Sequence, residues 1–138
     1  MPPITVLRML IVVELLSALL GIYADIALQA TFPPELQAYL LTESQGPFSA
    51  GDAVKGVFFL ALVVALIVAW VGLWLLKRWA RTLYTTLVVI SLVMTLFLGP
   101  VVTSAFAAAL YSISSLAGGI MLGLLWFSEL RGKFEARA

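Results

Sequence analysis

Cysteine and histidine are both absent from this chain of 138 residues. Without cysteine the chain can form no disulfide, no thiolate nucleophile and no iron–sulfur cluster. Without histidine it lacks the commonest ligand of haem and zinc, and it cannot build a Ser-His-Asp triad. We therefore expect no intrinsic cofactor, no metal and no enzymatic activity.

Charged residues are scarce, at 11% of the chain against about 25% in soluble domains. Apolar residues make up 63%, against roughly 45 to 50% in such domains. A chain this short cannot hide that excess in a core, because it buries only about two thirds of the surface that unfolding exposes. The net charge of +1 also lacks the basic face of a nucleic-acid-binding protein. The composition predicts an integral membrane protein whose surface is covered by lipid, with no nucleic-acid partner.

Four apolar runs approach the length of about 20 residues that crosses a bilayer core about 30 Å thick. They cover approximately residues 4–28, 53–76, 82–98 and 101–127. Gly99-Pro100 separates the last two runs, as is typical where one helix ends and another begins. We expect one all-α domain over residues 1–138, a membrane four-helix bundle. A cleavable signal peptide is the alternative interpretation of the first run, but Glu14 interrupts that run and it is too long.

Lysine and arginine are divided unevenly between the two sides of this four-span arrangement. Only Lys55 falls on one side, and all the others fall on the opposite side: Arg8, Lys77, Arg78, Arg81, Arg131, Lys133 and Arg137. Basic residues in short loops stay in the cytoplasm during insertion. The pattern predicts that both termini, the turn at 77–81 and the tail at 128–138 are cytoplasmic.

The loop at 29–52 is then the one long segment on the outer side. Pro33-Pro34-Glu35 is typical of a helix start, with proline early and an acid in the first turn. Leu36, Tyr39 and Leu40 share one face of such a helix. We expect a short interfacial helix on the outer membrane surface. The spacing from Ser49 to Asp52 also predicts a capping box before the second span.

Glu14 lies well inside the first apolar run, where an ionised acid is unfavourable by a few kcal/mol. It shares one helical face with small residues and a second acid, namely Ser17, Ala18, Gly21 and Asp25. We interpret this stripe as a packing seam in which Glu14 bonds a neighbouring helix. The alternative is a proton or cation site of a small transporter or channel, formed by Glu14, Ser17 and Asp25. At the depth of Glu14 the other spans place Trp70, Ser91 and Gly118 or Gly119, of which Ser91 is the predicted polar partner.

Two further spans carry small residues along one face. The last span has Ser104, Ala108, Ser112, Ser115, Gly119 and Gly123, and the second has Ala61, Ala65, Ala69 and Gly72. Small residues let the backbones of membrane helices approach closely. We therefore expect a non-enzymatic protein that acts through helix association, as a homo-oligomer or as an accessory subunit of another membrane protein.

The segment from Lys77 to Arg81 combines basic residues with Trp79, as is typical of an anchor at the membrane interface. We interpret Lys77, Arg78, Trp79 and Arg81 as such an anchor. The functional alternative is a site that binds or senses the headgroup of an anionic lipid. Membrane lipids are expected partners in either case.

Two motifs resemble those of known membrane proteins. Residues 72–81, with the sequence GLWLLKRWAR, and residues 127–134, FSELRGKF, are similar to the turn and tail of small four-span bacterial inner-membrane proteins without an assigned activity. This resemblance implies the bacterial inner membrane and no particular site. Glu14 in the first span is also similar to the acid of small multidrug transporters, but their loops are short throughout and their other motifs are missing here.

Overall fold

The chain folds into helices over nearly all of the part that is described, as expected. The computed structural model describes residues 2–44, 50–97, 101–129, 132 and 134, and these contain no strand. The elements are α1 (Pro3–Leu28), η1 (Gln29–Thr31), α2 (Pro34–Ser44), α3 (Ala50–Trp74), α4 (Arg78–Thr95) and α5 (Ala105–Phe127). The predicted all-α fold is confirmed.

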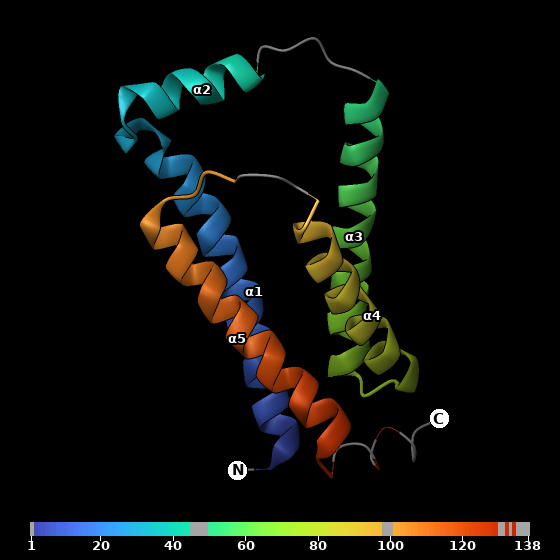
Figure 1. Ribbon diagram of the computed structural model, residues 1–138. Coiled ribbons are helices and arrows are strands. Elements are labelled where there is room, and N and C mark those ends of the chain that lie inside the picture. Colours follow the sequence, from blue (N-terminus) through green and yellow to red (C-terminus); the bar gives the residue numbers. More distant parts are fainter. Residues whose placement is uncertain (1, 45–49, 98–100, 130–131, 133, 135–138) are drawn as a thin grey trace.

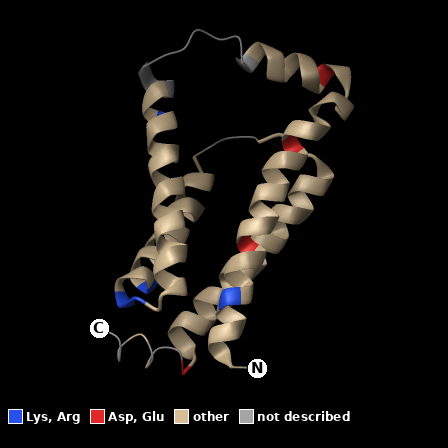
Figure 2. Cartoon of the chain, turned by 180° about the vertical axis from the view of Figure 1, so that it is seen from behind, with Lys and Arg blue, Asp and Glu red and all other residues tan. Residues whose placement is uncertain are grey.

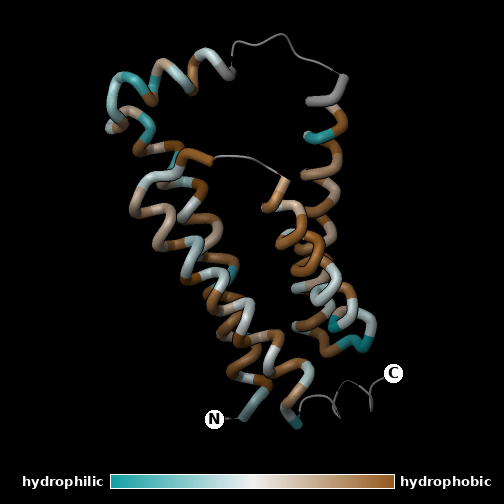
Figure 3. The backbone as a smooth tube through the Cα atoms, in the orientation of Figure 1, coloured by the Kyte–Doolittle hydropathy of each residue, from teal (hydrophilic) through white to brown (hydrophobic). Residues whose placement is uncertain are grey.

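Three helical segments are long and apolar enough to cross a membrane: Pro3–Thr31, Ala53–Trp74 and Ala105–Phe127. Figure 3 shows these helices predominantly in the hydrophobic colours. In the most apolar window of each, only 22 to 28% of the residues are buried, so most of their apolar side chains face outward. The fourth long helix, α4, is less apolar than these three segments, because its 18 residues include Arg78 and Arg81 as well as several threonines.

The four long helices form two pairs, α1 with α5 and α3 with α4 (Figure 1). The pairs come together near the N terminus and the end of α5, and they diverge toward the opposite end, where α2 lies. Direct packing between α1 and α3 is slight. The described part of the molecule is therefore joined mainly at one end.

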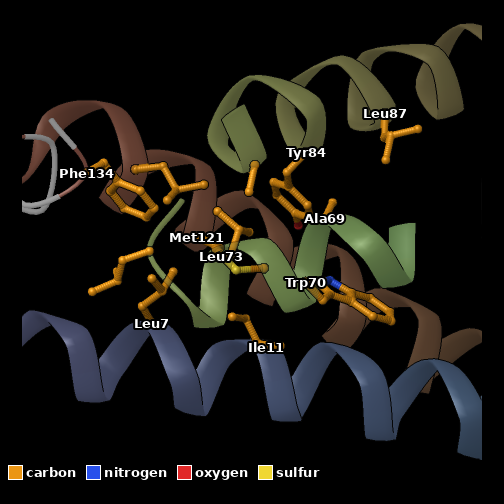
Figure 4. Close-up of a cluster of buried hydrophobic side chains, with 12 residues drawn as sticks. Leu7, Ile11, Ala69, Trp70, Leu73, Tyr84, Leu87, Met121 and Phe134 are labelled. Atoms are coloured by element: carbon orange, nitrogen blue, oxygen red, sulfur yellow. The ribbon is translucent and has the colours of Figure 1, made fainter. Parts of the chain in front are cut away.

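The buried core lies at the end where the pairs meet. Figure 4 shows Leu7 and Ile11 of α1 facing side chains from the other three long helices. The fully buried side chains of greatest volume are Tyr84, Phe134, Leu7, Leu73, Met121 and Leu125. One cluster thus holds all four long helices together.

The α1–α5 pair packs through small residues, as the stripe on α1 predicts. Ser17, Gly21 and Ala24 are buried. A β-carbon on Gly21 would lie 2.6 Å from Cε1 of Tyr111, so the tyrosine ring occupies the space that the glycine leaves. Small residues on α1 therefore allow an aromatic residue of α5 to lie against the α1 backbone.

The connection between α3 and α4 is shorter than predicted. The basic turn was expected at 77–81, but α4 begins at Arg78. The backbone N–H of Lys77 donates to the carbonyl of Gly72, and that of Leu76 donates to the carbonyl of Leu73. This is the Schellman pattern of a helix end, with Leu76 at φ 56° in the left-handed position that glycine usually takes. Because α3 ends in this tight turn, only residues 75–77 connect it to α4.

The short helix predicted in the long loop is present as α2 and begins at Pro34. The side-chain amide of Gln37 donates to the carbonyls of Phe32 (2.7 Å) and Ala30 (3.2 Å), which fixes the chain before the helix. The predicted capping box at Ser49–Asp52 and the Gly99-Pro100 junction involve residues outside the described ranges.

Candidate functional site

The carboxylate of Glu14 accepts one hydrogen bond from each helix of the opposite pair. Its Oε2 accepts from the indole Nε1 of Trp70 on α3 at 2.9 Å. Its Oε1 accepts from the hydroxyl of Tyr84 on α4 at 2.8 Å. Tyr84 is fully buried. Glu14 is thus a polar link from the α1–α5 pair to the α3–α4 pair.

Helix α5 completes this site by leaving space. A β-carbon on Gly118 would lie 3.0 Å from Oε1 of Glu14 and 2.9 Å from the hydroxyl oxygen of Tyr84. The hydroxyl of Ser114 donates to the backbone carbonyl of Glu14 at 3.3 Å. All four long helices therefore meet at Glu14, and a glycine is needed where α5 passes the carboxylate.

Neutral hydrogen-bond donors surround the Glu14 carboxylate. Both carboxylate oxygens already accept from neutral donors, and an indole N–H can only donate. Among the described residues there is no group of three or more acidic side chains that could hold a metal ion. The site can hold helices together, because donors buried in an apolar core are costly to leave unsatisfied.

Asp25 forms a second polar site, with α5 alone. Its Oδ1 accepts from the backbone N–H of Ser104 at 2.9 Å and from the Ser104 hydroxyl at 3.3 Å. Its Oδ2 accepts from the hydroxyl of Tyr111 at 3.1 Å. Ser104 is the N-cap of α5, and its Oγ accepts from the backbone N–H of Ala107. A carboxylate at a helix N-terminus is stabilised by the free N–H groups there.

The two acids are too far apart to act as one site. Eleven residues of helix separate Glu14 from Asp25, which corresponds to about 16 Å along the axis. Ser17 lies between them and donates its hydroxyl to the carbonyl of Val13 at 2.6 Å, within its own helix. The stripe predicted as a proton or cation site therefore contains two separate sets of interhelical bonds.

Ser91, the predicted polar partner of Glu14, is not brought to it. The Ser91 side chain is exposed and its hydroxyl donates to the carbonyl of Val88 on the same helix. Tyr84 takes the place expected of Ser91. The early start of α4 accounts for part of this difference: the helix begins at Arg78, four residues before the predicted start at 82, whereas Tyr84 and Ser91 are seven residues apart. Trp70 and Gly118, also expected at this depth, do lie at Glu14.

The four residues predicted as an interface anchor are divided by the structure. Lys77, Arg78 and Trp79 are exposed. Arg81 is only 7% exposed, and its guanidinium carbon lies 4.5 Å from the centroid of the Trp126 ring. Within the described part of the chain, Nε and Nη1 of Arg81 have no hydrogen-bond partner. Arg81 therefore packs between α4 and α5 and does not extend from the surface.

A second arginine–tryptophan contact was not predicted from the sequence. The guanidinium carbon of Arg8 on α1 lies 5.0 Å from the centroid of the Trp74 ring, at the last residue of α3. Such contacts stabilise by about 0.5 to 1 kcal/mol at exposed sites. A sequence alone could not indicate the contact, because it depends on which helix lies beside α1.

Comparison with known proteins finds no matching family model, no similar curated protein and no similar solved structure.

Proposed function

We propose that this chain is a non-enzymatic protein of a bacterial inner membrane that acts through association of its helices, as a homo-oligomer. In this proposal α1, α3, α4 and α5 all cross the bilayer, both termini are cytoplasmic and α2 lies on the outer surface. Three apolar helices support the membrane location. Most basic residues of the described chain lie at the end of the molecule where the N terminus lies (Figure 2). This distribution supports the proposal that this end faces the cytoplasm.

One observation carries the association: a small-residue face of α5 points outward and has no neighbour among the described residues. Ala108, Ser112, Ser115 and Gly119 are all exposed. No atom lies within 4 Å of a β-carbon built on Gly119 or on Gly123. By contrast, Gly21, Gly72 and Gly118 each lie against another helix of the same chain. The outward face of α5 is therefore a small-residue surface left available for another helix.

One of the two serine hydroxyls on this face, that of Ser112, does not require water. Ser112 donates to the carbonyl of Ala108 at 2.9 Å, within α5 itself. The face can therefore meet lipid or protein without leaving that donor unsatisfied. Small residues allow two such helices to approach closely, which gains van der Waals contact in a solvent that supplies no hydrophobic driving force. A second copy presenting the same face would form a symmetric dimer.

Cysteine cross-linking tests this proposal directly, because the chain has no cysteine of its own. We expect Ser115→Cys and Gly119→Cys to form disulfide-linked dimers in native membranes. The matched control is Ile113→Cys, since Ile113 is 47% exposed and lies on a different side of α5. Adding Gly119→Leu to Ser115→Cys should reduce the dimer, whereas Ile120→Leu should leave it unchanged. Equal cross-linking at Ile113 and Ser115 would show random collision and would overturn the dimer. Cross-linking only to a different protein would instead support an accessory subunit.

A further inference from the structure

An open apolar groove runs along the side of the molecule between α1 and α3. Its volume is about 520 Å³, and it is lined by apolar and aromatic side chains of α1 from Ile11 to Leu19 and of α3 from Ile67 to Trp74. The groove is a consequence of the divergence of the two helix pairs. Leu15 and Leu19 are 36% and 55% exposed, and Ile67 is 49% exposed, so little of the chain covers them.

A second hollow continues the groove toward the N-terminal end. It shares Val12 and Trp74 with the first, has a volume of about 380 Å³, and is also lined by Thr5, Arg8, Met9 and Val13. The two hollows form one strip, which we call the α1–α3 groove. It is apolar along most of its length, and of the described residues that line it Arg8, at one end, is the one cation.

Arg8 lies where a lipid headgroup would be. Its guanidinium stacks on Trp74, the last residue of α3, and Lys77 and Arg78 follow three and four residues later. Tryptophan beside basic residues is typical of the headgroup level of a bilayer. Glu14, the nearest acid on α1, has both oxygens occupied by Trp70 and Tyr84, so it does not neutralise Arg8.

The lining also argues against a second copy of the chain in this place. Leucine, isoleucine, valine and tryptophan line the groove, and these bulky residues hold a neighbouring helix backbone away. The small residues that favour helix contact are on the far face of α5 instead. A flexible acyl chain can follow an uneven bulky surface, and a single terminal cation matches a single phosphate.

We infer that the α1–α3 groove binds one phospholipid with a net negative headgroup, whose phosphate contacts Arg8 and whose acyl chain lies along Leu15, Leu19 and Ile67. This inference depends on the membrane location proposed above but not on self-association. A basic residue near a membrane surface contributes about 1 kcal/mol toward an anionic lipid, which corresponds to about a fivefold preference.

Trp70 and Trp74 line the groove, and they report on its occupant through fluorescence once the other two tryptophans, Trp79 and Trp126, are replaced by phenylalanine. We suggest nanodiscs of phosphatidylcholine that contain a small, graded fraction of bromine-labelled lipid, either phosphatidylglycerol or phosphatidylcholine. Bromine on the acyl chain quenches tryptophan on contact. For this protein with Trp70 and Trp74 as its two tryptophans, half-maximal quenching should need about fivefold less labelled phosphatidylglycerol than labelled phosphatidylcholine. Equal requirements for the two lipids would overturn the inference without any change to the groove itself.

Two matched pairs of variants locate the site. Arg8→Gln should abolish the headgroup preference, whereas Arg78→Gln, at an exposed position of the α4 start, should keep it. Leu19→Phe should fill the groove and raise the requirement for both lipids, whereas Leu16→Phe, at another exposed leucine of α1 outside the groove, should not. Loss of preference in Arg78→Gln as well would indicate a general basic surface and would contradict the site. Because dimer formation is measured separately by cross-linking, failure of one proposal does not imply failure of the other.

Discussion

Tyr84→Phe removes a single hydroxyl, and with it one of the two hydrogen bonds that hold the Glu14 carboxylate. The ring remains and the packing of this fully buried side chain is kept. The carboxylate then retains only the bond from Trp70 at 2.9 Å. The substitution therefore measures the interhelical bond itself and leaves the shape of the core unchanged.

The expected cost follows from the burial of the bond. A hydrogen bond to a charged group contributes about 1.5 to 3 kcal/mol in soluble proteins. Between membrane helices, measured couplings average about 0.6 kcal/mol and reach about 1.7 kcal/mol. Because Tyr84 is fully buried and no water can replace its hydroxyl readily, we expect a loss near the upper membrane value, about 1.5 kcal/mol.

Two substitutions of Glu14 separate its charge from its hydrogen bonds. In Glu14→Gln the amide oxygen can accept from Trp70 and the amide N–H can donate to the Tyr84 oxygen, since a tyrosine hydroxyl also accepts. We expect a loss of less than about 1 kcal/mol. Glu14→Leu leaves both buried donors without an acceptor, and we expect a loss of about 2 kcal/mol or more.

Reversible unfolding by dodecyl sulfate in mixed micelles, followed by far-ultraviolet circular dichroism, supplies these free energies. The matched control is Tyr23→Phe, since Tyr23 lies on α1, the helix of Glu14, and is 70% exposed. This substitution should change the free energy of unfolding by less than about 0.5 kcal/mol. In the Glu14→Leu background, Tyr84→Phe should cost little, because its acceptor is already absent. The polar link at Glu14 is refuted if Tyr84→Phe behaves like Tyr23→Phe, or if it costs as much with leucine at position 14 as with glutamate.

The same unfolding assay checks the α1–α5 pair at two more places. Asp25→Ala removes the acceptor of the Ser104 and Tyr111 bonds at the start of α5 and should cost about 1 to 2 kcal/mol, with Glu129→Ala, at an exposed position after α5, as the control. Gly21→Val places a β-carbon 2.6 Å from the Tyr111 ring and should cost about 1 to 3 kcal/mol. Gly56→Val, with no atom within 4 Å of its β-carbon, has the same helix propensity change and should cost clearly less. An equal loss for the two glycines would contradict the close packing of α1 on α5.

Helix positions could be predicted from the sequence because apolar length is set by the thickness of a bilayer. The run predicted at 4–28 corresponds to α1 at Pro3–Leu28, and the run at 101–127 corresponds to α5 at Ala105–Phe127. The small-residue stripe of α1 was likewise predictable, since a period of 3.6 residues fixes which side chains share a face. Such local rules require no knowledge of the neighbouring helix.

The partners of the acids could not be predicted in the same way. The start of α4 was placed at residue 82 because basic residues are expected in loops, yet Arg81 lies inside against Trp126. That shift of four residues is part of the seven-residue difference between Ser91, the predicted partner of Glu14, and Tyr84, the observed one. The bond from Tyr111 to Asp25 depends on α5 lying next to α1, and hydropathy gives no order for the helices around a bundle. Pairing between helices is thus the information that the sequence pattern lacks.

Trp70 belongs to both the polar link at Glu14 and the groove, and this allows the two to be tested separately. Its indole N–H donates to Glu14, while its ring is part of the lining of the α1–α3 groove. Trp70→Phe keeps an aromatic ring but removes the indole N–H that donates to Glu14. We expect it to lose about 1 to 1.5 kcal/mol of unfolding free energy, similar to Tyr84→Phe. The preference for anionic lipid, read from Trp74, should remain.

If Trp70→Phe abolished that preference while Tyr84→Phe left it intact, the groove would require the indole itself. If both substitutions abolished it, the lipid site would depend on the polar link that joins the two helix pairs.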